Sequence, residues 1–160
     1  MSDRSTNHAT FVIERTYGAA PSRVWRAWAD PVEKLRWFGP RTPSKPEHEL
    51  EFRVDGIEHM TVQAPDGALY TFAARYRDIV EGERFVHTYE MYRGDARISV
   101  SVTTVEFEAA GTGTKLTLTE QGVFLDGLDT PAEREHGTRE LLEALATHVE
   151  SAGSSHSTAS

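Results

Sequence analysis

The chain has 160 residues, of which 38% are hydrophobic and 26% charged, and this composition is typical of one globular domain with a sizeable core. The formal net charge of −8 argues against a basic surface for DNA or RNA and against docking on anionic lipid. The absence of cysteine excludes disulfides and cysteine-based zinc sites. No apolar run approaches the ~20 residues of a membrane span, so insertion into a membrane is not expected. The N-terminus has no apolar stretch of a signal peptide, which favours a cytoplasmic protein.

The two ends of the chain differ from its middle. Residues 1–9 and 151–160 are polar, small and without hydrophobic period, and this pattern predicts two disordered tails. No internal repeat or linker interrupts residues 10–150. We therefore expect a single domain over that range.

The first part of the domain predicts one strand and two short helices. Residues 10–17 alternate between apolar and polar side chains, as a half-buried strand does. Trp25 and Trp28 lie one helical turn apart and predict a first helix. Asp30 is followed by a proline and, two residues later, by an acidic residue, which is the pattern of a helix N-terminus. A second short helix is therefore expected, ending at the Gly-Pro pair after Phe38.

The middle of the chain predicts six consecutive strands. Gly-containing turn sequences separate them: DG, PDG, EGE, RGD and GTG. The expected strands are 47–54, 57–64, 69–80, 84–92, 96–109 and 114–124. Because each strand is joined to the next by a hairpin turn, the sheet is expected to be antiparallel.

The last part of the domain predicts a long helix over residues 131–150. Thr130, Pro131 and Glu133 form a capping box with proline at the first helical position. One face carries residues at helical spacing: Thr138, Leu141, Leu142, Leu145 and Val149. Charged residues, among them Arg134, are expected on the solvated remainder of the helix. The simplest packing is α+β, with a curved antiparallel sheet around this helix.

Several segments together resemble a known family. The segments ERTYGAAPSRVWRAWADPVEKLRWFGP, YRDIVEGERFVHTYE and GTKLTLTEQG occur in the order found in the SRPBCC (START-like) superfamily. Within it they are most similar to the activator of Hsp90 ATPase homologue 1-like branch, over residues 10–150. The resemblance implies the helix-grip (Bet v 1-like) fold, in which a curved seven-stranded sheet holds a long C-terminal helix. It also implies a cavity between sheet and helix, closed at one end by the two short helices.

The three tryptophans and Phe38 gather within one short stretch, and two interpretations are open. They pack in an ordinary core, or they line the implied cavity. Core packing is favoured for Trp25 and Trp28 because of their plain amphipathic spacing. Trp37 and Phe38, at the end of the second short helix, are favoured as the rim of a pocket.

Strand alternation places a set of polar residues on the core face. His87 and Tyr89 share a face with Phe85, Glu58 shares one with Met60, and Glu120 with two leucines. The candidate ligand-binding residues are therefore Trp37, Phe38, Glu58, Met60, Tyr70, Phe72, His87, Tyr89, Glu120, Leu141 and Leu145. The alternative is structural: each acid lies in water near a strand end, and the histidine is hydrogen-bonded in the core.

One position departs from the resembling proteins. They carry two glycines where this chain has Asp55-Gly56, so the turn before Glu58 is expected to differ.

The seven histidines lack the spacing of a metal site, and GTGTK joins two strands rather than opening a helix. Neither a metal nor a cofactor is expected.

The leading functional hypothesis is a binding protein for an apolar, aromatic or lipid-like small molecule. One alternative is an enzyme such as a cyclase, dehydratase or hydrolase that uses Glu58, His87 and Glu120. Another is a protein-interaction or chaperone-linked module. Hsp90 itself is not expected as a partner, because the chain has no room for the accessory domain of the eukaryotic activators. Relatives of this size suggest a homodimer.

Overall fold

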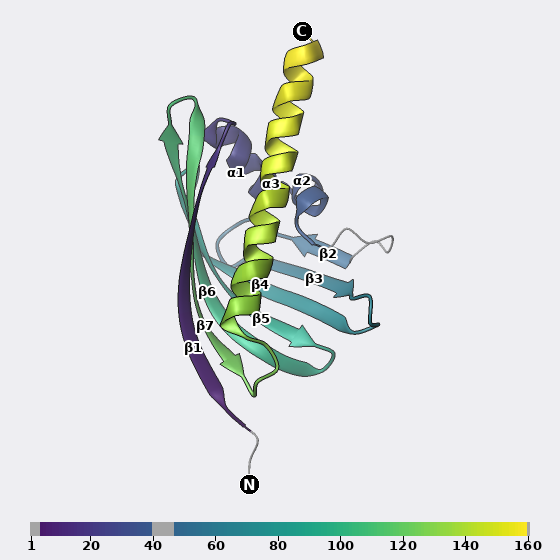
Figure 1. The fold of residues 1–160 in the computed structure, drawn as a ribbon. Coiled ribbons are helices and arrows are strands. Elements are labelled where there is room, and N and C mark those ends of the chain that lie inside the picture. Colours follow the sequence, from purple (N-terminus) through teal and green to yellow (C-terminus); the bar gives the residue numbers. More distant parts are fainter. Residues whose placement is uncertain (1–3, 40–46, 160) are drawn as a thin grey trace.

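One curved antiparallel sheet and three helices make up the described part of the chain, which is residues 4–39 and 47–159 of a computed structural model (Figure 1). The strands are β1 (Thr6–Tyr17), β2 (Glu47–Leu50), β3 (Ile57–Gln63), β4 (Leu69–Val80), β5 (Arg84–Arg93), β6 (Ala96–Ala110) and β7 (Gly113–Leu125). The helices are α1 (Pro21–Ala29), α2 (Pro31–Trp37) and α3 (Pro131–Ala159).

The sheet has the strand order β1-β7-β6-β5-β4-β3-β2, so the first strand lies beside the last. Each remaining strand pairs with its neighbour in sequence, as the hairpin turns predicted. The sheet bends around α3, and α1 and α2 lie beside this helix (Figure 1). The predicted α+β helix-grip fold is thereby confirmed.

Three element boundaries differ from the prediction by more than one residue. β1 begins at Thr6, because residues 6–9 extend the ladder with β7 and pair Thr6 with Leu125. The sequence predicts a disordered tail for these polar residues, because the pairing of backbone groups along a strand does not require alternating apolar side chains. β2 ends at Leu50 instead of residue 54, and α3 continues to Ala159 instead of residue 150.

The turn that precedes β3 accommodates the Asp-Gly pair. Asp55 has a φ of 68°, the left-handed conformation that aspartate tolerates better than most residues. A Cβ on Gly56 would lie 2.2 Å from the Glu51 carbonyl oxygen, so glycine is required there. Asp55 therefore takes a conformation that glycine favours, and the turn forms with aspartate in place of the first glycine of the resembling proteins.

The tryptophans pack in the core. Trp25 makes edge-to-face contacts with Phe52 and Phe107, at ring-centroid distances of 5.5 and 5.0 Å. The rings of Trp28 and Trp37 are 4.7 Å apart, and Trp37 Nε1 donates to the Ala27 carbonyl at 3.0 Å. All three side chains are buried, as expected for Trp25 and Trp28. Trp28 and Trp37 nevertheless also face a pocket.

Candidate functional site

A pocket of about 270 Å³ lies between α3, the two short helices and the concave face of the sheet. The aromatic side chains of its wall come from the two short helices and from two strands. Trp28, Trp37 and Phe38 lie in or next to α1 and α2, and Phe72 and Tyr89 lie on β4 and β5. The helix α3 contributes Leu141, Leu142 and Gly137, and β7 contributes Leu118. The pocket is thus formed mainly by apolar side chains, as is common for small-molecule sites.

Most of the candidate residues from the sequence line this pocket. They are Trp37, Phe38, Phe72, His87, Tyr89, Glu120 and Leu141. Four others do not: Glu58, Met60, Tyr70 and Leu145. Glu58 and Met60 are buried on the correct face of β3, but Glu58 binds the side chain of Lys34, which itself lines the pocket.

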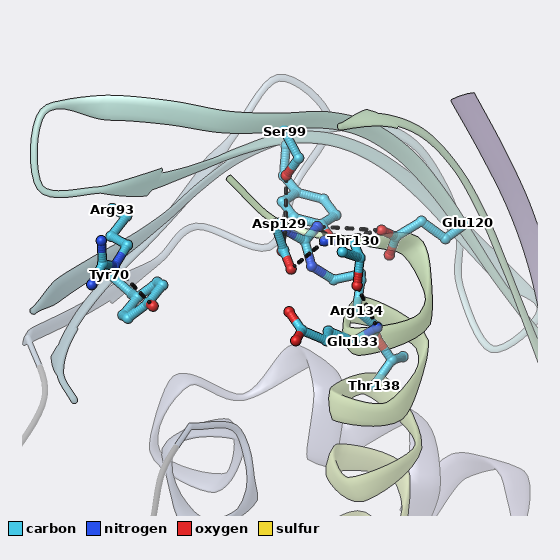
Figure 2. A network of polar contacts seen from close by, with 10 residues as sticks. Tyr70, Arg93, Ser99, Glu120, Asp129, Thr130, Glu133, Arg134 and Thr138 are labelled. Atoms are coloured by element: carbon cyan, nitrogen blue, oxygen red, sulfur yellow. Dashed lines mark hydrogen bonds and ion pairs between the residues drawn. The ribbon is translucent and has the colours of Figure 1, made fainter. Parts of the chain in front are cut away.

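Tyr70 and Leu145 are displaced for different reasons. Tyr70 lies at the start of β4, where its hydroxyl accepts a hydrogen bond from Arg93 at 3.2 Å, away from the start of α3 (Figure 2). Leu145 is fully buried in the hydrophobic core, one helical turn beyond Leu141. Strand and helix periodicity gives the face of a residue but not its position along the cavity.

The carboxylate of Glu58 is at the centre of a buried polar cluster. Lys34 Nζ lies 2.6 Å from Glu58 Oε1, and the Tyr76 hydroxyl donates to the same oxygen at 2.6 Å. His48 Nε2 lies 2.9 Å from Glu58 Oε2. Lys34 is 1% exposed and Glu58 0%. The side chains come from α2, β2, β3 and β4, so the cluster ties the short helix to one edge of the sheet.

The two charges of this cluster depend on each other. Burial raises the pKa of Glu58, but attraction to Lys34 and hydrogen bonds from His48, Lys34 and Tyr76 outweigh burial and lower it to about 2. Burial also lowers the pKa of Lys34, an effect that Glu58 opposes. Glu58 is therefore a carboxylate at neutral pH, and Lys34 Nζ lies at ion-pair distance from it, 2.6 Å from Oε1.

A second polar cluster joins the start of α3 to the sheet. Arg134 donates to the Tyr89 hydroxyl at 2.8 Å and to Ser99 Oγ at 2.9 Å. It also forms ion pairs with Asp129, at 2.8 Å, and with Glu120, at 3.5 Å. Figure 2 shows the Arg134 side chain reaching from the helix between these partners. The cluster fixes one end of the pocket, which Glu120, Asp129 and Arg134 also line.

Glu120 has an unusual environment for a carboxyl group. The Tyr89 hydroxyl donates to Glu120 Oε2 at 2.7 Å and Thr103 to Oε1 at 3.4 Å. Burial raises the pKa of Glu120, and the opposing effects of Arg134 and these hydrogen bonds do not fully compensate. A carboxyl group with a raised pKa beside a pocket has the properties required of a general acid or base.

His87 lies between the two clusters and belongs to neither. It is 5% exposed, and its ring centroid is 5.4 Å from that of Tyr76 and 5.6 Å from that of Tyr89. Burial, together with the positive charge of Lys34, lowers the pKa of His87 to about 4, so the imidazole is neutral at neutral pH. Its Nδ1 is buried and finds no hydrogen-bond partner among the described residues, and the same is true of Trp28 Nε1.

The sequence model of the activator of Hsp90 ATPase homolog 1-like proteins matches residues 18–150. The chain belongs to this family. A search of curated proteins found no match. Similar solved structures include an uncharacterised protein from Rhizobium leguminosarum, which is 44% identical, with a TM-score of 0.88 over 92% of this chain and 97% of its own.

Two further structures of the same fold come from other bacteria. A Rhizobium loti protein is 44% identical, with a TM-score of 0.84 over 90% of this chain and 99% of its own. A Chromobacterium violaceum protein is 28% identical, with a TM-score of 0.75 over 88% of this chain and 96% of its own. The resemblance to this family that the sequence indicated is therefore confirmed, and it specifies the fold rather than a ligand.

In this member of the family, sequence reasoning missed the cationic partners of the two buried acids. Arg134 was assigned to the solvated face of α3, but it is only 9% exposed. The spacing of the helix indicates the buried position, because Arg134 lies four residues before Thr138 and seven before Leu141 and so shares their core-facing side. Lys34 gave no comparable indication, since lysine in a short helix is normally exposed.

The described residues contain no group of three or more histidine, aspartate or glutamate side chains placed to hold a metal ion. Within the same residues, no helix combines the length and the hydropathy needed to cross a bilayer.

Proposed function

We propose that the protein binds a small apolar or aromatic molecule in the pocket between α3 and the sheet. The observation that carries this proposal is the aromatic wall around open space: Trp28, Trp37, Phe38 and Phe72 all line the 270 Å³ pocket. An apolar ligand that replaces water there gains about 25 cal/mol for each Å² of apolar surface removed from water. The volume is just below the range of ~300–1,000 Å³ for drug-sized ligands, which favours a molecule of one or two rings.

The direct test begins with protein purified from its own host or a heterologous one. Native mass spectrometry of the fresh protein should detect a co-purified small molecule. An apolar fluorophore should bind at a saturable site with a change in tryptophan emission, because Trp28 and Trp37 line the pocket.

A pair of variants distinguishes this pocket from other surfaces. Leu141→Trp places a larger ring in the pocket wall and should weaken binding of the fluorophore at least tenfold. Val12→Trp, on the outer face of β1 where Val12 is 52% exposed, is the matched control and should leave affinity unchanged. Equal affinity for both variants, or binding only under unfolding conditions, contradicts the proposal.

A second candidate function is catalysis on such a ligand. It is favoured by the raised pKa of Glu120 beside Tyr89 and by the neutral His87, all three of which line the pocket. Glu120 and His87 would serve as the proton-transfer groups. Turnover of the identified ligand with a bell-shaped dependence on pH, lost in Glu120→Gln, supports this function. Binding without turnover in the same assay contradicts it.

A further inference from the structure

We propose that the buried wall of this pocket binds the oxygen of a neutral aromatic ketone or aldehyde through Trp28, Lys34 and His87. This inference rests on the proposed function, because it assumes that the pocket is a ligand site. It adds the chemical class of the ligand and the three groups that recognise it.

The first observation is unused hydrogen-bonding capacity in the pocket wall. Trp28 and His87 both line the pocket, and each has a buried ring nitrogen for which residues 4–39 and 47–159 provide no hydrogen-bond partner. Such groups are uncommon in folded proteins, since an unpaired buried donor or acceptor costs roughly 1–3 kcal/mol. An indole nitrogen can only donate, so the partner that Trp28 lacks is an acceptor.

Lys34 adds a second donor beside Trp28, and His87 adds a third when the proton of its neutral ring is on Nδ1. The ammonium group of Lys34 has three N–H bonds, and its hydrogen-bond partners within the described chain are Glu58 Oε1 at 2.6 Å and the Tyr76 hydroxyl at 3.4 Å. Nζ otherwise lies over the rings of Phe38 and Trp28, 4.4 and 5.3 Å from their centroids. The wall therefore offers more donors than acceptors, and a ligand oxygen is the complementary group.

The charges around the pocket select a neutral ligand. A cationic group at this wall is repelled by Lys34. An anionic group meets three pocket-lining carboxyl groups, Glu120, Asp129 and Glu133, against only two cations, Lys34 and Arg134. Both cations are already paired with carboxylates of the chain. A carbonyl oxygen accepts hydrogen bonds without bringing a charge into the site. It is therefore repelled neither by Lys34 nor by the carboxyl groups.

The test uses three naphthalene compounds of similar shape. 2-Acetylnaphthalene carries the carbonyl acceptor, 2-ethylnaphthalene replaces it by a methylene group, and 2-naphthoate carries a charge. Dissociation constants are measured by isothermal titration calorimetry and by quenching of tryptophan fluorescence. We expect the ketone to bind about tenfold more tightly than the hydrocarbon, which corresponds to one net hydrogen bond. The naphthoate should bind most weakly.

Two variants test which side chains bind the carbonyl oxygen of the ketone. His87→Phe and Trp28→Phe each remove ring nitrogens and keep an aromatic ring, and each should reduce the preference for the ketone by about threefold or more. Leu141→Ala is the matched control, because it should weaken both compounds and leave their ratio unchanged. Circular dichroism verifies that every variant is folded.

The outcomes separate this inference from the proposed function. Equal affinities for ketone and hydrocarbon in the unmodified protein contradict the binding of a carbonyl oxygen by the pocket wall. They do not contradict ligand binding in the pocket. A preference for the ketone that persists in both His87→Phe and Trp28→Phe also overturns the inference. If none of the three compounds binds, both the inference and the proposed function fail.

Discussion

The buried ion pair between Lys34 and Glu58 should show a large energetic coupling. Both side chains are at most 1% exposed, and their charged atoms are 2.6 Å apart. Replacing Lys34 by methionine leaves a buried carboxylate that keeps Tyr76 and His48 as its partners in the described part of the chain. Breaking one side of a buried pair costs about 3–5 kcal/mol, so Lys34→Met and Glu58→Gln should each lower the free energy of unfolding by that amount.

The double variant carries the decisive information. With neither charge present, Lys34→Met/Glu58→Gln leaves no uncompensated charge, and the glutamine side chain still offers hydrogen bonds to Tyr76 and His48. We expect the double variant to lose about 3 kcal/mol less than the sum of the two single losses, and this difference is the coupling energy of the pair. Urea unfolding followed by tryptophan fluorescence measures all four proteins of the cycle.

An exposed ion pair of the same chain provides the control. Arg84 and Asp78 are 2.8 Å apart, but their side chains are 52% and 42% exposed. The same cycle on this pair should give a coupling of about 1 kcal/mol or less. If the losses of Lys34→Met and Glu58→Gln simply add in the double variant, the two residues do not act as a pair and this reasoning is refuted.

Three other expectations concern pH, the helix and the second cluster. The pKa of Glu58 is lowered from 4.5 to about 2 in the folded protein, so its stabilising contribution is present above about pH 4.5 and is lost as the pH falls towards 2. Urea unfolding over this range should show the loss, and Glu58→Gln should lack that component. A Cβ on Gly137 would meet no atom within 4 Å, so Gly137→Ala should raise the free energy of unfolding by roughly 0.5–1 kcal/mol, measured in urea. A decrease would indicate that the alanine is strained there. Arg134→Met should lower the free energy of unfolding by about 3 kcal/mol, because Glu120 and Asp129 lose their cation. A melting temperature equal to that of the unmodified protein would contradict this.

The fold was predictable from the sequence to a large extent, because several independent local patterns agree. Glycine-containing turns separate the strands at regular intervals, and the ranges 69–80 and 131–150 carry clear strand and helix periods. Alternation also placed Glu58, His87 and Glu120 on the buried face, where the structure has them. Each of these predictions uses only neighbours in the chain.

The arrangement of the site was less predictable, because it depends on partners far apart in sequence. Glu58, His87 and Glu120 were expected around one cavity, but Glu58 is paired with Lys34 and Glu120 with Arg134. These contacts join α2 to β3 and α3 to β7. They depend on how the short helices and α3 dock on the sheet, which no periodicity in the sequence encodes.

The neighbouring positions of β1 and β7 have a consequence for the kinetics of folding. β1 precedes the other strands in the chain, yet its neighbour in the described sheet is β7, the last strand, and Thr6 pairs with Leu125. Contacts between residues so far apart in sequence form slowly, since a long loop must close before they are made. During synthesis on the ribosome, β1 therefore remains without its strand partner until β7 has emerged. This early exposure makes the N-terminal segment the part of the chain most prone to aggregate or to bind a chaperone during synthesis.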